Sequence, residues 1–378
     1  MVYSFDVFDT CIVRTWARPA DLFYFLAETL LAATGQPYGR EEVGELAAAR
    51  VAAERQAHRK TSKQDINLDD IYAELDLTGW GFSAMEMREA EVRLELEAVR
   101  PVVPIRSRIE ALRAAGERVV FISDMYLPKP VIREMLARCG FEVPEGTLYV
   151  SNELDETKRA GGLYRHVLEK EGVKAKELRH CGDGVESDFL GARKAGVQGE
   201  LLTVTQPNRF EKAVLRVPSA NPWVTSQLAG IARATRLGVA KDELQGSAEI
   251  ASSVVAPLLV GFVLWAMRDA QARGLKRLYF VARDGQVLHK VARALDPDGS
   301  RFGVEARYLY GSRQAWYIPS AFSVGRGELE FVLMTGQSSA PRHNLRRVNL
   351  TPEALEGPLT RYGFPKSTWE TQLEGEAV

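Results

Sequence analysis

Strand-like and helix-like segments alternate, with short connections, between residues 101 and 205 of this 378-residue chain. A helical pattern leads into the apolar run RVVFIS, and the strand-like segments TLYV, LRHCG and GELLTV follow, each preceded by a further helical pattern. Parallel strands need crossover connections, and helices supply them on both faces of a sheet. The alternation therefore predicts an α/β fold built on a doubly wound parallel sheet.

The chain also begins with a strand-like run, VYSF, which is followed by the acidic residues Asp6 and Asp9. Residues 14–100 are nearly all helical in pattern, and Asn67 is expected to cap one of these helices. The simplest arrangement places the first strand in the same sheet and makes the helical stretch an insertion after it. We therefore expect a core of residues 1–13 and 101–205, with a helical cap of residues 14–100.

Residues 206–244 lack clear periodicity and contain three prolines, so we expect a linker there. A second α/β domain is predicted over residues 245–378, and we expect it to be incomplete in this chain. Its loops place Arg283-Asp284-Gly285 and Ser312-Arg313 after strand-like runs. Such loops hold phosphates or sugars in other folds. An equally good interpretation makes Asp284 a helix cap.

Composition and charge limit the class of protein. A formal net charge of −1 argues against a nucleic-acid binder that works through bulk charge. Three scattered cysteines and the absence of a signal-peptide pattern favour a reducing cytoplasm. The uncharged run from Ser252 to Met267 is shorter than the roughly 20 residues of a membrane span, so a buried core helix is expected and no membrane association. The sequence assigns no oligomeric state.

Polar residues follow the strand-like runs at the positions where ligands gather in a parallel sheet. They are Asp6, Asp9, Thr10, Ser123, Asp124, Lys158, Asp183 and Asp188. Each has an ordinary alternative when taken alone: a helix cap, a turn residue or a surface lysine. Together they are hard to explain as structure, because buried carboxylates are costly unless they are paired or bound to metal.

This ordered set resembles the haloacid dehalogenase-like (HAD) hydrolase superfamily. Its four motifs correspond to DVFDT, the serine of FISDMY, the lysine of ETKRAGG, and GDGVESD, over residues 1–205. The insertion after the first motif is similar in position to the C1 cap of that superfamily. The strings SFDVFDT, RPADLF and SDMYLP further resemble a branch of predicted HAD hydrolases with a second domain that carries an ARDG-type motif.

The resemblance implies a role for each matching residue in phosphate-ester chemistry. Asp6 would be the nucleophile and a metal ligand, and Asp183, Asp188 and the backbone carbonyl of Phe8 would complete the protein ligands of Mg²⁺. Ser123 and Lys158 would hold the phosphoryl group and offset its charge.

Four further residues are candidates for binding the substrate. Thr10 would position the first loop, and Asp124 adjoins the phosphoryl site. Arg14, with Arg18, is a candidate for an anion of the substrate. The alternative for both arginines is a surface position at the hinge of the cap.

Phe8 departs from the HAD pattern, in which a second aspartate at this position is the general acid and base. A phenyl ring cannot fill that role, whose loss typically costs about 10²–10⁴-fold in rate. Three possibilities stay open: Asp9 substitutes, the substrate has a good leaving group, or turnover is slow or absent.

The sequence thus predicts a Mg²⁺-dependent HAD phosphatase that acts on a small phosphorylated metabolite through an aspartyl phosphate. The alternative is a non-catalytic or very slow module that binds a phosphorylated ligand or partner. Metal-independent dehalogenation is disfavoured by the fourth motif, GDGVESD.

Overall fold

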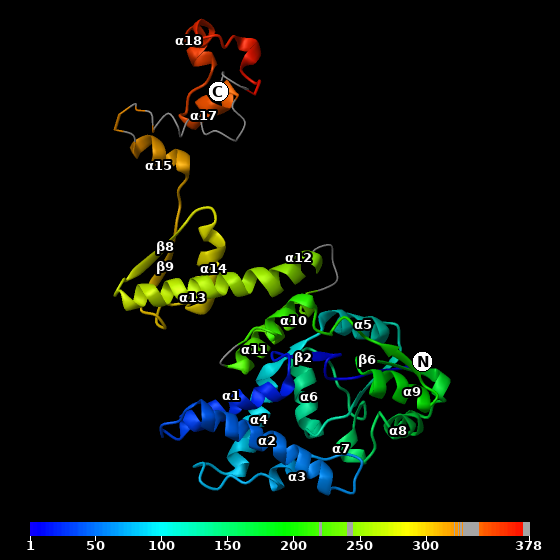
Figure 1. The fold of residues 1–378 in the computed structure, drawn as a ribbon. Helices are drawn as coiled ribbons and strands as arrows, with labels where there is room; N and C mark the ends of the chain where they lie inside the picture. The colour runs from blue at the N-terminus through cyan, green and yellow to red at the C-terminus, as the bar shows by residue number, and fades with distance from the viewer. Residues whose placement is uncertain are drawn as a thin grey trace. The chain divides into compact units, whose positions relative to one another are not determined.

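The computed structural model describes residues 1–218, 221–239, 245–320, 322, 323, 325, 327 and 340–372. The chain divides into two compact units, Met1–Pro257 and Leu258–Val378. Both are drawn in Figure 1 and are described separately below.

Five parallel strands form the central sheet of the first unit, in the order β5-β4-β1-β6-β7. Their bounds are β1 (Val2–Phe5), β4 (Arg118–Ser123), β5 (Leu148–Val150), β6 (Leu178–Gly182) and β7 (Gln198–Leu201). Phe5 of β1 lies opposite Phe121 on one side and Cys181 on the other. The carboxyl ends of the three central strands therefore meet at one edge, and the predicted α/β parallel sheet is confirmed.

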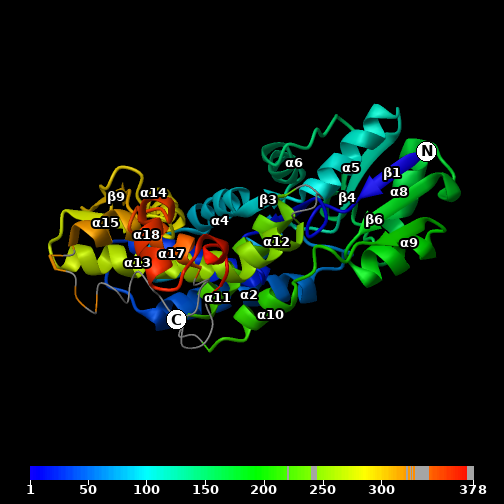
Figure 2. The same ribbon diagram turned by 90° about the horizontal axis from the view of Figure 1, so that it is seen from above.

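Helices cover both faces of this sheet (Figure 2). One face packs against α5 (Val103–Ala114) and α6 (Lys129–Arg138). The other packs against α8 (Gly162–Glu171) and α9 (Gly191–Lys194). The side chains of β4 alternate accordingly, because successive residues of a strand point to opposite faces. Val119 and Phe121 enter one core, and Val120 and Ile122 enter the other.

The helical insertion leaves and rejoins the core through a short antiparallel ribbon of β2 (Ile12–Arg14) and β3 (Val99–Pro101). Between these strands lie α1 (Leu22–Ala33), α2 (Arg40–Lys60), α3 (Leu68–Ala73) and α4 (Ala84–Ala98). Asn67 caps α3 as predicted, since its side chain accepts a hydrogen bond from the backbone of Asp70 at 2.9 Å.

A buried ion pair lies inside this cap. Both nitrogen atoms Nε and Nη2 of Arg50 lie 2.7 Å from the Glu91 carboxylate, and both side chains are fully enclosed. The hydroxyl of Tyr72 donates to Glu91 at 2.7 Å, and that of Tyr126, from the loop after β4, does so at 3.3 Å. This network joins cap helices α2 and α4 to a core loop.

The stretch expected to be a linker contains helices that belong to the first unit. They are α10 (Arg209–Leu215) and α11 (Pro222–Leu237). Arg236 of α11 pairs with Glu211 of α10 at 2.6 Å and donates to the carbonyl oxygen of Val204 at 2.8 Å. Specific polar contacts such as these help to attach the two helices to the core. The hydrophobic pattern of the stretch is correspondingly weak, since a helix attached in this way needs no wide apolar stripe.

The second unit contains a two-stranded parallel sheet among its described residues, made of β8 (Arg277–Val281) and β9 (Glu305–Leu309). The crossover between them is α14 (Gly285–Leu295), and Phe280, Phe302 and Ala292 contribute to a small core with α13 (Ala256–Ala272). Shorter helices complete the described part: α15 (Arg313–Ser320), α17 (Pro341–Arg347) and α18 (Glu356–Arg361).

The apolar segment around residues 252–267 differs from the prediction of a buried core helix. It lies within a continuous helix, Gly246–Ala272, that is long and apolar enough to cross a membrane by length and composition, with 22% of its most apolar window buried. The helix extends beyond the uncharged run on both sides, and Ile250 and Ala251 lengthen that run before Ser252. Core helices of soluble proteins can meet the same criterion.

The remaining short elements connect these parts. They are the helices α7 (Ser151–Leu154) and α12 (Gln245–Ile250), the 3₁₀ turns Pro19–Asp21, Ala175–Glu177, Glu353–Leu355 and Lys366–Thr368, and the π-helical turns Val185–Leu190 and Ala251–Val255.

Candidate active site

Polar residues from three central strands converge at the carboxyl edge of the sheet. Asp6 follows β1, Ser123 ends β4, and Asp183 follows β6. The backbone N–H of Asp6 donates to the carbonyl oxygen of Cys181 at 2.9 Å, which continues the ladder between β1 and β6 by one residue. The register of the sheet thus fixes Asp6 between the ends of its two neighbours, where ligands bind in folds of this kind.

Lys158 joins two of the carboxylates. Its Nζ atom lies 2.5 Å from Oδ1 of Asp6 and 2.6 Å from Oδ1 of Asp188, and all three side chains are buried. The carboxylate of Asp124 accepts two hydrogen bonds from the backbone N–H of Lys158, at 2.9 and 3.1 Å. Asp124 therefore holds the loop that carries the lysine.

Burial and like charges oppose ionisation of two of the acids. Burial raises the pKa of Asp6 well above its usual value, although the ammonium of Lys158 counteracts it. The pKa of Asp183 rises to about 7, first through burial and then through the charges of Asp9 and Asp188. A cation at this site would relieve both effects, because it would offset the negative charge that burial makes costly.

The charge of Lys158 is secured by its partners. Burial alone would lower the pKa of Lys158, but the carboxylates of Asp6 and Asp188 raise it well above its usual value. Burial would likewise raise the pKa of Asp188, yet Lys158 and His180 hold it well below its usual range. Lys158 is therefore an ammonium and Asp188 a carboxylate at neutral pH.

Asp188 makes two further contacts besides its ion pair with Lys158. Its Oδ2 atom accepts a hydrogen bond from the backbone of Gly184 at 2.7 Å, and its Oδ1 atom lies 3.1 Å from Nε2 of His180. Glycines provide the space, because a Cβ on Gly182 would lie 2.4 Å from Cγ of Asp188. The glycines of GDGVESD are thus required for packing around Asp188, whereas the aspartates of the same motif supply the carboxylates.

Three carboxylates are close enough to share a metal ion. One carboxylate oxygen each of Asp6, Asp183 and Asp188 lies within 4.8 Å of the others. Oxygen donors of this kind suit a hard cation such as Mg²⁺, which commonly keeps waters beside one or two protein carboxylates. Nε2 of Gln206 donates to Oδ2 of Asp183 at 3.0 Å and so orients the least buried of the three acids.

Two hydroxyls line the same site. Ser123 is buried, and its Oγ atom has no hydrogen-bond partner among the described residues. A buried polar atom without a partner is costly, so an oxygen-rich ligand at this position would satisfy it. Thr10 is buried as well, and its hydroxyl lies 3.4 Å from Oδ2 of Asp6, at the long end of hydrogen-bonding distance.

The side chain of Phe8 contacts the hinge of the cap. The guanidinium carbon of Arg14 lies 4.4 Å from the centre of the Phe8 ring, a cation–π distance. Arg14 is buried, and its Nε atom donates to Glu95 of α4 at 2.8 Å. The structure therefore places Arg14 in an enclosed contact between hinge and cap rather than at an open anion site.

Asp9 has a left-handed backbone, φ 52°, and lies three residues after Asp6 in the loop that follows β1. Its Oδ1 atom lies 3.0 Å from Nη1 of Arg233, and its side chain is about one-third exposed. The charge of Asp9 also contributes to the raised pKa of Asp183.

Sequence reasoning missed three residues that contact the site: His180, Gln206 and Arg233. His180 stands between Arg179 and Cys181 in LRHCG, and the available signal was a polar residue at an inward-facing position of a central strand. Its ring also contacts Ser4 of β1 at 2.8 Å. Gln206 and Arg233 carry no sequence signal, because the connection between β7 and α10 brings Gln206 near the site and the packing of α11 brings Arg233 near it.

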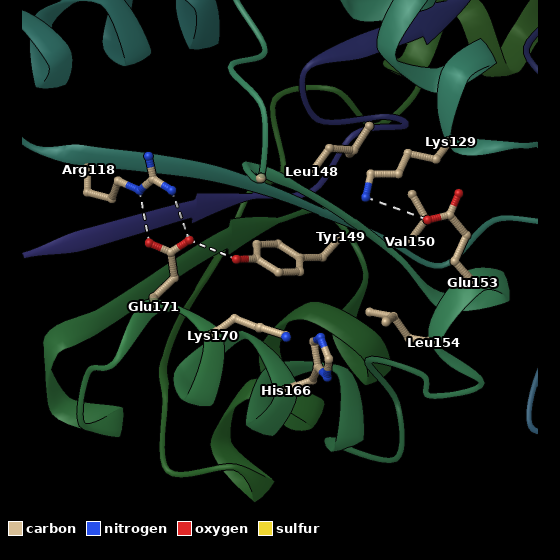
Figure 3. A pocket seen from close by; sticks show the side chains of 11 residues that line it. Arg118, Lys129, Leu148, Tyr149, Val150, Glu153, Leu154, His166, Lys170 and Glu171 are labelled. Carbon is tan, nitrogen blue, oxygen red and sulfur yellow. Dashed lines mark hydrogen bonds and ion pairs between the residues drawn. The ribbon is translucent and has the colours of Figure 1, made fainter.

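A cavity lies elsewhere, at the β5 edge of the sheet (Figure 3). Its volume is about 570 Å³, and Tyr149, His166 and Lys170 line it. Most of its charged groups are already paired, as in Arg118 with Glu171 at 2.9 Å. None of the clustered carboxylates lines it, so it is not the site of their chemistry.

The loops of the second unit show no comparable convergence among their described residues. The side chains of Arg283 and Asp284 are about nine-tenths exposed. Nε of Arg283 lies 3.2 Å from Oδ1 of Asp284, the next residue in the chain. Asp284 occupies the N-cap position of α14, but its side chain makes no capping hydrogen bond. Gly285 is required for packing, because a Cβ there would lie 2.6 Å from the backbone of Phe280.

Comparisons with known proteins bear on the first unit. No family model matches the chain, and no curated protein matches it. Among solved structures, a HAD phosphatase from Thermococcus onnurineus is similar over 53% of this chain and 86% of its own, with 15% identity and a TM-score of 0.36.

Two further structures are similar over about the same length. A 2-haloacid dehalogenase from Pseudomonas syringae pv. Tomato DC3000 matches 52% of this chain and 83% of its own, with 18% identity and a TM-score of 0.37. A HAD-family hydrolase from Deinococcus radiodurans R1, with bound phosphate and sodium, matches 52% and 77%, with 16% identity and a TM-score of 0.31. The similar structures thus include both phosphatases and dehalogenases.

Proposed function

We propose that the first unit is a Mg²⁺-dependent phosphohydrolase of HAD type, which acts on a small phosphorylated metabolite through an aspartyl phosphate at Asp6. The observation that carries this proposal is the buried arrangement of Asp6, Lys158 and Asp188 beside the unpartnered hydroxyl of Ser123. It offers a carboxylate nucleophile, a fixed cation, and a free donor for a phosphoryl oxygen.

The proposed reaction has two steps. A carboxylate oxygen of Asp6 forms a bond to phosphorus, and the bond from phosphorus to the leaving oxygen breaks. Water then attacks the aspartyl phosphate, which releases inorganic phosphate and regenerates the carboxylate. Lys158 and Ser123 bind the phosphoryl oxygens in both steps, and Thr10 orients the loop.

Asp6, Asp183 and Asp188 would hold the metal ion, together with the backbone carbonyl of Phe8. Mg²⁺ would supply positive charge against the phosphoryl oxygens and so allow one anion to attack another. Asp9 is our candidate for the acid and base that Phe8 cannot provide. Asp124 positions Lys158, and we assign Arg14 to the cap hinge rather than to the substrate.

The alternative function is a binding module with very slow or no turnover. The contact between Phe8 and Arg14 favours it, because a side chain that packs on the hinge contributes no proton to a leaving group. Under either function we propose a cytoplasmic protein, which agrees with three buried, unpaired cysteines.

A panel of phosphate esters tests the proposal, with Mg²⁺ present and with EDTA. We expect release of phosphate by the native protein, loss of at least a thousandfold in Asp6→Asn, and loss with EDTA. Equal rates in the native protein and Asp6→Asn would contradict the assignment. Halide release from 2-haloacids without Mg²⁺ would instead support a dehalogenase.

A further inference from the structure

Helix α11 packs against the chain segment that leaves the first motif. The backbone N–H groups of Ala17 and Arg18 donate to the carbonyl oxygen and the hydroxyl of Ser226, at 2.9 and 3.0 Å. A Cβ on Gly230 would lie 2.4 Å from the backbone of Thr15. Because glycine has no side chain, the helix can approach the hinge more closely here than it could with any other residue. The helix and the hinge are therefore in direct backbone contact.

This contact delivers Arg233 to Asp9. Arg233 lies three residues after Gly230, which places it on the same side of the helix. It is 4% exposed, and its Nη1 atom lies 3.0 Å from Oδ1 of Asp9. Its Nε atom is buried and has no partner among the described residues. Asp9 is the ion-pair partner of this guanidinium among the described residues, and breaking a buried ion pair is costly, so the two side chains hold each other in place.

The surroundings of this ion pair are rich in acid. Asp6, Asp9, Asp183 and Asp188 lie around it, and Lys158 engages two of them. Arg233 engages a third, Asp9, from an element outside the sheet. Asp9 has a left-handed backbone, and its carboxylate reaches this helix at Arg233.

We propose that Arg233 is a positioning residue of the active site, which holds the Asp9 carboxylate beside the clustered metal-binding acids. This inference rests on the proposed function, and it makes α11 a part of the catalytic unit. Asp9 thereby provides a carboxylate on the loop in which Phe8 has no charged group. The orientation of the Asp9 side chain is set by Arg233, which lies outside that loop.

Kinetics of four variants test the inference: Arg233→Met, Arg233→Lys, Asp9→Asn, and the double variant Arg233→Met with Asp9→Asn. We expect kcat to fall at least tenfold in Arg233→Met with KM within about twofold, and Arg233→Lys to recover part of the loss. The double variant should be no slower than Asp9→Asn alone, because both changes remove the same interaction. A raised KM at unchanged kcat, or additive losses, would overturn the inference, since either would mean that Arg233 binds substrate or acts independently.

Binding of Mg²⁺ gives a readout that needs no turnover. By calorimetry with the metal alone, Asp9→Asn should weaken binding by about three- to tenfold. Arg233→Met should change the affinity of the native protein but not that of Asp9→Asn, because Arg233 acts through the Asp9 carboxylate. Arg216→Met removes an equal charge from the exposed residue that follows α10 and is the matched control. An equal effect of Arg233→Met in both backgrounds, or none in either, would overturn the inference. The expected pattern without any turnover would uphold it while rejecting the phosphatase.

Discussion

Phe8 is the residue at which the sequence departs most clearly from a phosphatase pattern, and its ring packs on Arg14. An aspartate there would face the same guanidinium, which would hold it in an ion pair. We therefore expect Phe8→Asp to raise phosphatase turnover by less than about threefold and to cost about 1–3 kcal/mol of stability. Steady-state kinetics and thermal unfolding measure both effects.

Phe8→Leu is the control for lost aromatic packing, because it keeps an apolar side chain and adds no charge. If Phe8→Asp instead raised turnover a hundredfold, the missing proton donor would be the limiting feature. The role that we assign to Asp9 would then be rejected.

The raised pKa of Asp183 predicts how the affinity for metal depends on pH. Its pKa of about 7 in the metal-free protein means that a proton occupies the carboxyl below neutrality, and Mg²⁺ must displace it. We expect the affinity for Mg²⁺ to fall by up to about tenfold per pH unit below pH 7 and to level off above it. Calorimetry at pH 6, 7 and 8 measures this dependence, and a flat profile would contradict it.

The same shift predicts a trend in stability. Because the pKa of Asp183 is raised from 3.8 on folding, the metal-free protein should lose stability as pH rises from about 4 to 7. Mg²⁺ should reverse that loss, so the rise in unfolding temperature on adding Mg²⁺ should be larger at pH 8 than at pH 6.

At the scale of elements, the contact between α11 and the hinge depends on the absence of a side chain at Gly230. Gly230→Ala would place a methyl group 2.4 Å from the backbone of Thr15, and the helix would have to move. We expect a loss of about 1–3 kcal/mol and a fall in kcat, because Arg233 would move with the helix.

Gly44→Ala is the matched control for this substitution. Gly44 lies within α2 of the cap, and a Cβ there meets nothing within 4 Å. Alanine should stabilise that helix by up to about 1 kcal/mol and leave kinetics unchanged. Equal effects of the two substitutions would show that α11 is not held against the hinge.

At the scale of the molecule, the two units have separate hydrophobic cores among their described residues. All three cysteines, Cys11, Cys139 and Cys181, are buried in the first unit, so thiol labelling reports its opening. We expect Mg²⁺ to raise the temperature at which these thiols become reactive by several degrees, since a ligand of the folded state stabilises it.

The calorimetric transition of the second unit should not move with Mg²⁺, because its described residues hold none of the clustered acids. Asp6→Asn should reduce the shift in thiol reactivity. A shift of the same size in both units would contradict this assignment of the metal site.

The sequence by itself determined the sheet and the acids at its edge. Alternating strands and helices predict a parallel sheet, and parallel strands bring their carboxyl ends to one edge, so Asp6, Ser123 and Asp183 were expected at the same edge. Asn67 as a cap was equally local, because the cap and the backbone that it binds are three residues apart.

Only the tertiary structure decided what surrounds those acids. The pairs Arg233–Asp9, Gln206–Asp183 and Arg14–Glu95 join residues far apart in sequence, and no pattern encodes their distances. The expected linker contains a helix that reaches Asp9 through Arg233, because α11 packs on the hinge. Burial of the apolar helix, 22% over its most apolar window, likewise could not be read from its own sequence. Periodicity and motifs report local structure, whereas ion pairs and burial depend on how distant elements meet.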